Sequence, residues 1–190
     1  MGVGIKYIDS AGNEHSLDEL FHFDHVTAAL LAIDHVHHEI HEAHTYTASK
    51  VITLPVGASA NILISTGKVA RHEFAHLIYQ VISDDVLTVN FFEEPDYAGG
   101  NALATFNRNR EHTTDDSMVT LADTATDSGG GTGTLIWTFK AGANKTVTAS
   151  ESERFEFILK EDTKYLLQAV GAQNDIVTFL LDWYEHGEGR

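Results

Sequence analysis

An alternation of apolar and polar residues with a period of two restricts the fold of this chain more than any other feature. Its clearest instance has the apolar members Val177, Phe179, Leu181 and Trp183. Successive side chains of a β-strand point to opposite faces, so this period predicts a strand with one buried face. Two further runs show the same pattern, with apolar members Leu135, Trp137 and Phe139 in one and Phe155, Phe157 and Leu159 in the other.

Short runs of β-branched and aromatic residues recur from residue 46 to residue 184. They number about ten, at the spacing typical of a β-sandwich or a β-barrel. Residues 113–134 are rich in Thr, Asp and Gly and are predicted to form a mobile surface loop. The sequence therefore predicts an N-terminal segment, residues 1–45, followed by one all-β domain, residues 46–190.

The N-terminal segment carries two local signals. A strand is predicted at residues 5–9, before the turn-forming residues 10–13. A helix is predicted from Ser16, which would cap it, with Glu19 three residues further on. Residues 26–33 fit a helix or an extended chain equally well. We therefore expect an N-terminal arm or helical segment.

The composition of the chain argues against nucleic acid and against a membrane as partners. With 28 acidic and 12 basic residues, its formal net charge is −16. Such a surface repels phosphate, and nucleic-acid binding would need a basic stripe that the sequence lacks. The chain has no cysteine, which excludes disulfides and thiolate metal sites. No apolar run approaches the roughly 18 residues that span a bilayer, so we expect neither nucleic acid nor a membrane as partner.

The stretch His72-Glu73-Phe74-Ala75-His76 matches a zinc-hydrolase pattern. In that pattern two histidines one helical turn apart bind zinc and the glutamate activates water, so a helix is required. The surrounding run 69–82 suits a strand better because it carries the β-branched residues Val69, Ile78, Val81 and Ile82. In a strand the two histidines would lie about 13 Å apart, too far to share one zinc ion. We therefore predict a strand and assign no catalytic, cofactor-binding or metal residue; a zinc hydrolase stays an alternative.

Histidines gather between His22 and His44, where seven of the chain's 12 lie. His37 and His41 would share one face of a helix, whereas His35 and His37 would share one face of a strand. Either arrangement can bring imidazoles to a metal ion, within one chain or across a symmetric oligomer. The alternatives are rings that pack at an interface with another subunit, which we favour, or a solvated face.

The stretch Asn107-Arg108-Asn109-Arg110 offers two guanidinium groups, which bind phosphate or carboxylate groups well. A strand end that pairs with local acids or with a neighbouring subunit explains the same residues. We favour this second interpretation.

Three blocks of the sequence resemble the small head decoration, or cement, proteins of tailed bacteriophages. The first is Ile33-Asp34-His35-Val36-His37-His38-Glu39-Ile40-His41-Glu42 running into Tyr46-Thr47, and the second is Asn107-Arg108-Asn109-Arg110. The third joins Leu159-Lys160-Glu161-Asp162-Thr163-Lys164-Tyr165-Leu166 with Leu181-Asp182-Trp183-Tyr184-Glu185-His186. Their order and spacing extend over most of residues 30–186.

The resemblance implies a jelly-roll-like antiparallel β-sandwich, commonly a homotrimer, that binds the major capsid protein on the outside of the expanded head. It implies a non-enzymatic structural protein of the virion, made in the host cytoplasm. A terminal arm that orders on docking is a common device for such a contact, and residues 1–45 are the candidate arm. The residues expected at a capsid or subunit contact are His37, His38, Glu39, Ile40, His41, His44, Asn107, Arg108, Asn109 and Arg110.

A head fibre or attachment module that binds host-surface glycans is the main alternative. Exposed Trp and Tyr side chains on one sheet would favour it. Trp137 and Trp183 both lie on the apolar side of their strands, which predicts core packing and favours the decoration protein.

Overall fold

The chain forms two compact units in the computed structural model, Met1–His38 and Glu39–Arg190. No described helix has the length and hydropathy needed to traverse a lipid bilayer. The structure describes residues 6–8, 14–16, 39–67, 73–111, 117–141, 156–171 and 174–187.

In the first unit, strand β1 (Lys6–Ile8) pairs antiparallel with β2 (Glu14–Ser16). The strand predicted at residues 5–9 is therefore confirmed. The helix predicted to follow Ser16 and the ambiguous segment 26–33 lie outside the described residues.

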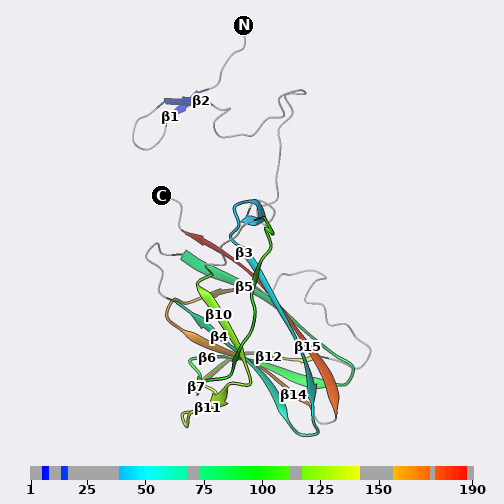
Figure 1. Ribbon diagram of the computed structural model, residues 1–190. Helices are drawn as coiled ribbons and strands as arrows, with labels where there is room; N and C mark the ends of the chain where they lie inside the picture. Colours follow the sequence, from blue (N-terminus) through cyan, green and yellow to red (C-terminus); the bar gives the residue numbers. More distant parts are fainter. Residues whose placement is uncertain are drawn as a thin grey trace. The chain divides into compact units, whose positions relative to one another are not determined.

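The second unit consists mainly of a six-stranded and a five-stranded sheet, shown as arrows in Figure 1. The six-stranded sheet contains, in spatial order, β12 (Thr134–Ala141), β6 (Leu87–Glu93), β14 (Lys164–Gly171), β4 (Ser59–Thr66), β10 (Val119–Asp123) and β8 (Asn101–Ala102). The five-stranded sheet contains, in spatial order, β13 (Phe157–Leu159), β5 (Glu73–Ser83), β15 (Asp175–Gly187), β3 (Thr45–Leu54) and β9 (Phe106–Asn107). Two short strands, β7 (Tyr97–Ala98) and β11 (Thr126–Asp127), pair with each other.

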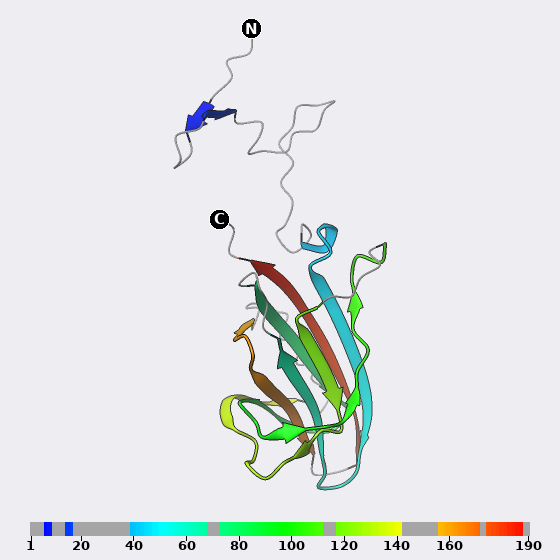
Figure 2. The same cartoon turned by 60° about the vertical axis from the view of Figure 1, so that its left-hand side comes forward.

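The connectivity is that of a jelly roll, because strands β3 to β6 pair with strands β12 to β15 in reverse order. Strand β3 pairs with β15, β4 with β14, β5 with β13 and β6 with β12, all antiparallel. Successive strands from β3 to β6, and again from β12 to β15, alternate between the two sheets. Figure 2 shows β3 and β15 running side by side. The predicted jelly-roll-like antiparallel sandwich is therefore confirmed.

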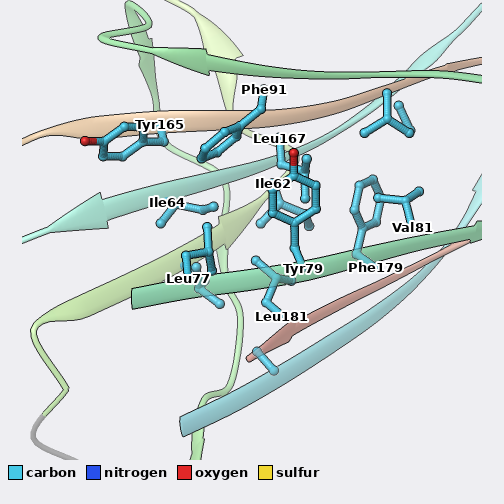
Figure 3. Packing of buried hydrophobic residues seen from close by; sticks show 14 of the residues in the cluster. Ile62, Ile64, Leu77, Tyr79, Val81, Phe91, Tyr165, Leu167, Phe179 and Leu181 are labelled. Atoms are coloured by element: carbon cyan, nitrogen blue, oxygen red, sulfur yellow. The ribbon is translucent and has the colours of Figure 1, made fainter. Parts of the chain in front are cut away.

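The core lies between the two sheets and is built from the alternate side chains of each strand that point inward. In Figure 3, Phe91, Tyr165 and Leu167 of the six-stranded sheet face side chains of the other sheet, among them Leu77, Tyr79, Val81, Phe179 and Leu181. The rings of Tyr79 and Phe91 approach across the sheets with centroids 5.3 Å apart. Each large side chain that is fully buried stabilises the fold by about 1.5–3 kcal/mol. The alternation of residues 177–183 is confirmed, since all four apolar members are buried.

A second, smaller apolar cluster covers part of the outer face of the six-stranded sheet. Leu63 of β4 and Leu166 of β14 point outward there and are buried. Tyr97 of β7 and Ala125, which precedes β11, pack on them. The insertion that carries β7 and β11 thus shields this face of the sandwich from water.

Strand β12 departs from its prediction in two ways. It is the edge strand of the six-stranded sheet, and its register with β6 shifts between Leu135 and Trp137. This β-bulge places Leu135 opposite the outward-facing Phe92, so the prediction that Leu135 lies on the buried side is wrong. Trp137 does face inward, opposite Phe91, but 38% of it stays exposed because no strand flanks it on the outer side within the described residues. The prediction of full core packing is therefore wrong for Trp137 and correct for Trp183, which is buried.

The prediction of one surface loop over residues 113–134 is also wrong. This segment contains β10, which pairs with β4 over its whole length. Val119 and Leu121 of that strand are buried in the main core. Five residues of strand are too short a signal to stand out among the surrounding Thr, Asp and Gly residues. Residues 112–116 lie outside the described part of the chain.

Candidate functional site

The first residues of the sandwich form a short helical turn, residues 39–41, closed by a left-handed residue. Ala43 has φ 62°, and the backbone N–H of His44 donates to the carbonyl of Glu39 at 2.9 Å. The N–H of Ala43 donates to the carbonyl of Ile40 at 3.1 Å. These two bonds form a Schellman motif, with alanine at a position that favours glycine. A contact of 3.1 Å between His44 Nδ1 and a carboxylate oxygen of Glu39 supports the same turn.

This turn is held by the second sequence block, whose first residue, Asn107, is the last residue of β9. The side-chain amide of Asn107 donates to the carbonyl of Ala43 at 2.6 Å, and that of Asn109 donates to the carbonyl of His41 at 3.1 Å. The backbone N–H of Arg108 donates to the carbonyl of Thr45 at 2.8 Å. Two blocks separated by more than sixty residues therefore meet, and we call residues 39–44 and 107–111 together the end cluster.

Hydrogen bonds within residues 107–111 also fix the conformation of this segment. The Asn107 side-chain oxygen accepts the N–H of Asn109 at 2.8 Å, and the Asn109 side-chain oxygen accepts the N–H of Glu111 at 3.2 Å. Such Asx turns are a common reason for asparagine in a turn. The guanidinium of Arg110 donates to the carbonyl of Asn107 at 3.3 Å and lies 5.4 Å from the centre of the Phe106 ring. The bends that point the arginines outward are thus built by the two asparagines.

The end cluster contains eight of the ten residues that the sequence analysis assigned to a contact. His37 and His38 lie outside the described residues. Glu39 and Asn107 are buried, with 6% and 0% of their surface exposed, and they hold the cluster together from inside. Ile40 and Asn109 are half-buried, and the exposed members are His41, His44, Arg108 and Arg110. The cluster therefore presents a surface of mixed charge, on which exposed imidazole and guanidinium groups lie among the exposed acids Glu42 and Glu111.

Beside the end cluster lies a buried carboxylate that the sequence analysis did not identify. The N–H of Glu185 donates to the carbonyl of His44 at 2.9 Å. Its carboxylate accepts the backbone N–H of Met118 at 3.1 Å and the indole N–H of Trp183 at 2.9 Å. It also accepts the hydroxyl of Ser117 at 2.5 Å. The sequence carried a signal for this residue, because the period of two that buries Trp183 also points Glu185 to the inner face of the strand.

The zinc-hydrolase pattern lies in a strand over its described part, as predicted, because β5 begins at Glu73. His72 is outside the described residues. His76 points to the outer face of β5, where its Nδ1 contacts the carboxylate of Glu156 and its ring stacks on Tyr184 with centroids 4.5 Å apart. The hydroxyl of Tyr184 donates to the same carboxylate at 2.7 Å. These contacts fix the chain immediately before β13, whose Ile158 pairs with His76.

No group of three or more histidine, aspartate or glutamate side chains in the described ranges could hold a metal ion. An ion pair between Lys50 of β3, which is partly exposed, and the buried Asp123 of β10 joins the two sheets. The hydrogen bond from Lys50 is the main reason that the pKa of Asp123 lies below its usual value. This pair acts in the fold rather than at an open site.

A comparison with protein-family models and a comparison with curated proteins give no match for this chain. The resemblance to decoration proteins therefore rests on the three sequence blocks. Described residues of the first two blocks lie in the end cluster, and the third block covers the end of β13, the start of β14 and the end of β15.

Proposed function

We propose that this chain is a non-enzymatic structural protein of a virion, which binds the outer surface of a phage capsid and reinforces the expanded head. The observation that carries the proposal is the end cluster. Its side-chain hydrogen bonds hold the outward-pointing His41, Arg108 and Arg110 on a rigid turn. A rigid, charged and imidazole-bearing surface at one end of a sandwich fits a contact with another protein.

Charge and fold agree with this role. A net charge of −16 would be repelled by packaged DNA, so the exterior of a shell suits the chain better than its interior. A jelly roll provides a stiff scaffold whose loops and ends are free to carry contacts. The partners that we propose are the major capsid protein and further copies of the chain, as in the trimers that the resemblance implies, with synthesis in the host cytoplasm.

The experiment that tests the proposal is the copy number of the chain in purified particles, relative to the major capsid protein, by quantitative mass spectrometry. A ratio near one to one, or another simple fraction of the shell's subunit number, is expected. A few copies per particle would point to a fibre or tail module. Absence of the chain from particles would overturn the proposal.

The exposed side of β12 favours one alternative, an attachment module that binds host-surface glycans. Trp137 is partly exposed on the inner face of this edge strand, and Leu135 is exposed on its outer face. Aromatic and apolar side chains at an open sheet edge are common in sugar-binding sites because sugar rings stack on them. Binding of the chain to a glycan array, lost in Trp137→Ala, would establish this function.

A further inference from the structure

The hydroxyl group of Tyr79 is buried between the two sheets without a hydrogen-bond partner among the described residues. Only 7% of the surface of this tyrosine is exposed. Other polar groups of the core are paired: the indole N–H of Trp183 donates to Glu185, and the hydroxyl of Tyr165 accepts the N–H of Lys160. A buried hydroxyl without a partner lowers stability, so it calls for an explanation outside the fold.

Aromatic rings from both sheets surround this tyrosine. The centroid of its ring lies 5.3 Å from that of Phe91, 6.2 Å from that of Phe157 and 6.4 Å from that of Phe139. The ring of Trp137 in turn lies 6.4 Å from that of Phe157. Figure 3 shows the hydroxyl oxygen of Tyr79 directed away from β5 toward the other sheet. An apolar, aromatic lining with few polar groups is typical of small-molecule sites.

These rings lie at a side of the sandwich where both sheets end. Within the described ranges, β12 is the edge of the six-stranded sheet and β13 is the edge of the five-stranded sheet. Strand β13 pairs with β5 only at residues 75–77, so no described strand flanks β5 on this side at Tyr79. Trp137 is exposed, and Phe139 and Phe157 are half-buried. The aromatic lining around the hydroxyl therefore continues to the surface of the protein.

We propose that this edge of the sandwich binds a small apolar molecule with a ring and an acceptor oxygen, which takes the hydrogen bond of the Tyr79 hydroxyl. The ring of the ligand packs beside Trp137 and Phe157, since aromatic rings attract one another in offset and edge-to-face arrangements. Burial raises the pKa of Tyr79, so its hydroxyl stays protonated and serves as the donor well above neutral pH.

The unpaired hydroxyl also gives the site its selectivity. A ligand with an acceptor removes the cost of the unpaired donor, whereas an analogue without one leaves that cost in place. The site differs from a glycan site on the exposed Trp137, because the many hydroxyl groups of a sugar would find no partners in this apolar lining. The inference does not rest on the proposed function, because it needs neither a capsid nor a second copy of the chain.

The test is a titration of the isotope-labelled full-length chain, followed by nuclear magnetic resonance. The probes are acetophenone, an aromatic ketone, and ethylbenzene, which has a similar shape but no acceptor. The chain has two tryptophans, so the indole N–H signal of Trp137, assigned by its loss in Trp137→Phe, reports on the site and that of Trp183 is the reference. We expect acetophenone to shift the Trp137 signal in a saturable way.

In Tyr79→Phe the dissociation constant of acetophenone is expected to rise about fivefold, because one net hydrogen bond is lost. That of ethylbenzene should stay within about twofold, since the hydrocarbon never used the hydroxyl. The matched control is Tyr165→Phe, which removes a core hydroxyl that already has a partner and should change neither constant. Thermal unfolding checks that both variants are folded.

Absence of a saturable shift with acetophenone, up to its solubility limit, would overturn the inference. So would acetophenone binding that Tyr79→Phe leaves unchanged, because the hydroxyl would then not contact the ligand. Equal weakening of both probes by Tyr79→Phe, or of acetophenone by Tyr165→Phe, would also overturn it, since packing rather than the hydrogen bond would then explain the effect.

Discussion

The side-chain amide of Asn107 donates a hydrogen bond of 2.6 Å to the carbonyl oxygen of Ala43, although 64 residues separate the two. Both lie in the end cluster, and Asn107 is fully buried. The bond satisfies a carbonyl at the end of the helical turn, where the backbone has no further helical donor. One side chain thus joins the entry of the sandwich to the turn that carries the two arginines.

Replacing Asn107 by alanine is expected to lower the free energy of unfolding by about 2 kcal/mol, since it leaves the Ala43 carbonyl and the Asn109 N–H without this partner. Chemical denaturation measures the change. Asn174→Ala is the control, because Asn174 is exposed and its side-chain oxygen accepts the N–H of the exposed Val56 at 3.2 Å, so a change within about 0.5 kcal/mol is expected. Equal effects of the two substitutions would contradict a special role for Asn107.

Replacing Tyr79 or Tyr165 by phenylalanine is expected to change the free energy of unfolding in opposite directions. The Tyr79 hydroxyl is buried and has no hydrogen-bond partner among the described residues, whereas that of Tyr165 accepts the N–H of Lys160 at 2.8 Å. Removing an unpaired buried hydroxyl relieves a desolvation cost, so Tyr79→Phe is expected to raise the free energy of unfolding by about 1 kcal/mol. Tyr165→Phe is expected to lower it by about the same amount.

Denaturation of both tyrosine variants at neutral and alkaline pH extends this test. Burial raises the pKa of Tyr79. Because the folded state favours the protonated phenol, stability is expected to fall as pH rises above about 10, the ordinary value for tyrosine. Tyr79→Phe should weaken this alkaline loss. An alkaline profile identical to that of the wild type would show that Tyr79 does not contribute to it.

The sequence predicted the long central strands because each has one side buried in a single apolar core. Residues 177–183 of β15 have a strand on both sides, so burial followed the period of two without interruption. The edge strand β12 does not follow this pattern, because a bulge between Leu135 and Trp137 places these two residues on opposite faces of the sheet. A bulge of one residue leaves no local signature, so sequence alone could not place it.

The sequence analysis assigned ten residues of the segments 37–44 and 107–110 to a capsid or subunit contact without placing the two segments beside one another. The structure brings their described members together in the end cluster, and the contact itself stays a prediction. Nothing local could separate the buried Glu39 and Asn107 from the exposed Arg108, because that difference depends on pairing between distant strands. The Glu156 carboxylate that contacts His76 was missed, since the two residues meet only through the pairing of β13 with β5.

Contact between Glu156 and both His76 and Tyr184 predicts that this carboxylate keeps β13 in register. Glu156→Gln is expected to lower the free energy of unfolding by about 1–2 kcal/mol, because hydrogen bonds to a charged acceptor are stronger than those to an amide. Thermal unfolding measures the change, with Glu161→Gln as the control because no side-chain bond of Glu161 is described. If adding zinc shifted the unfolding temperature of the wild type but not that of His76→Ala, His76 would instead have to be assigned to a metal.

The ion pair between Lys50 and Asp123 predicts a loss of stability in acid. The pKa of Asp123 in the folded state is lowered, chiefly by its hydrogen bond from Lys50. Its contribution is therefore fully present above the ordinary carboxylate value of about 4 and is lost as pH falls through the lowered folded value. Lys50→Met leaves the buried carboxylate without its cation and is expected to cost about 2 kcal/mol at neutral pH.

The difference in the free energy of unfolding between the wild type and Lys50→Met should become smaller below about pH 4. There the carboxyl group of Asp123 becomes protonated in the variant and in both unfolded chains. Urea denaturation of both proteins over a range of pH values measures it. Lys140→Met is the matched control, because Lys140 is exposed on the edge strand β12 and should change stability by no more than about 0.5 kcal/mol at any pH. A difference for Lys50→Met that stays constant down to pH of about 3 would mean that Lys50 acts through the packing of its aliphatic stem rather than through Asp123.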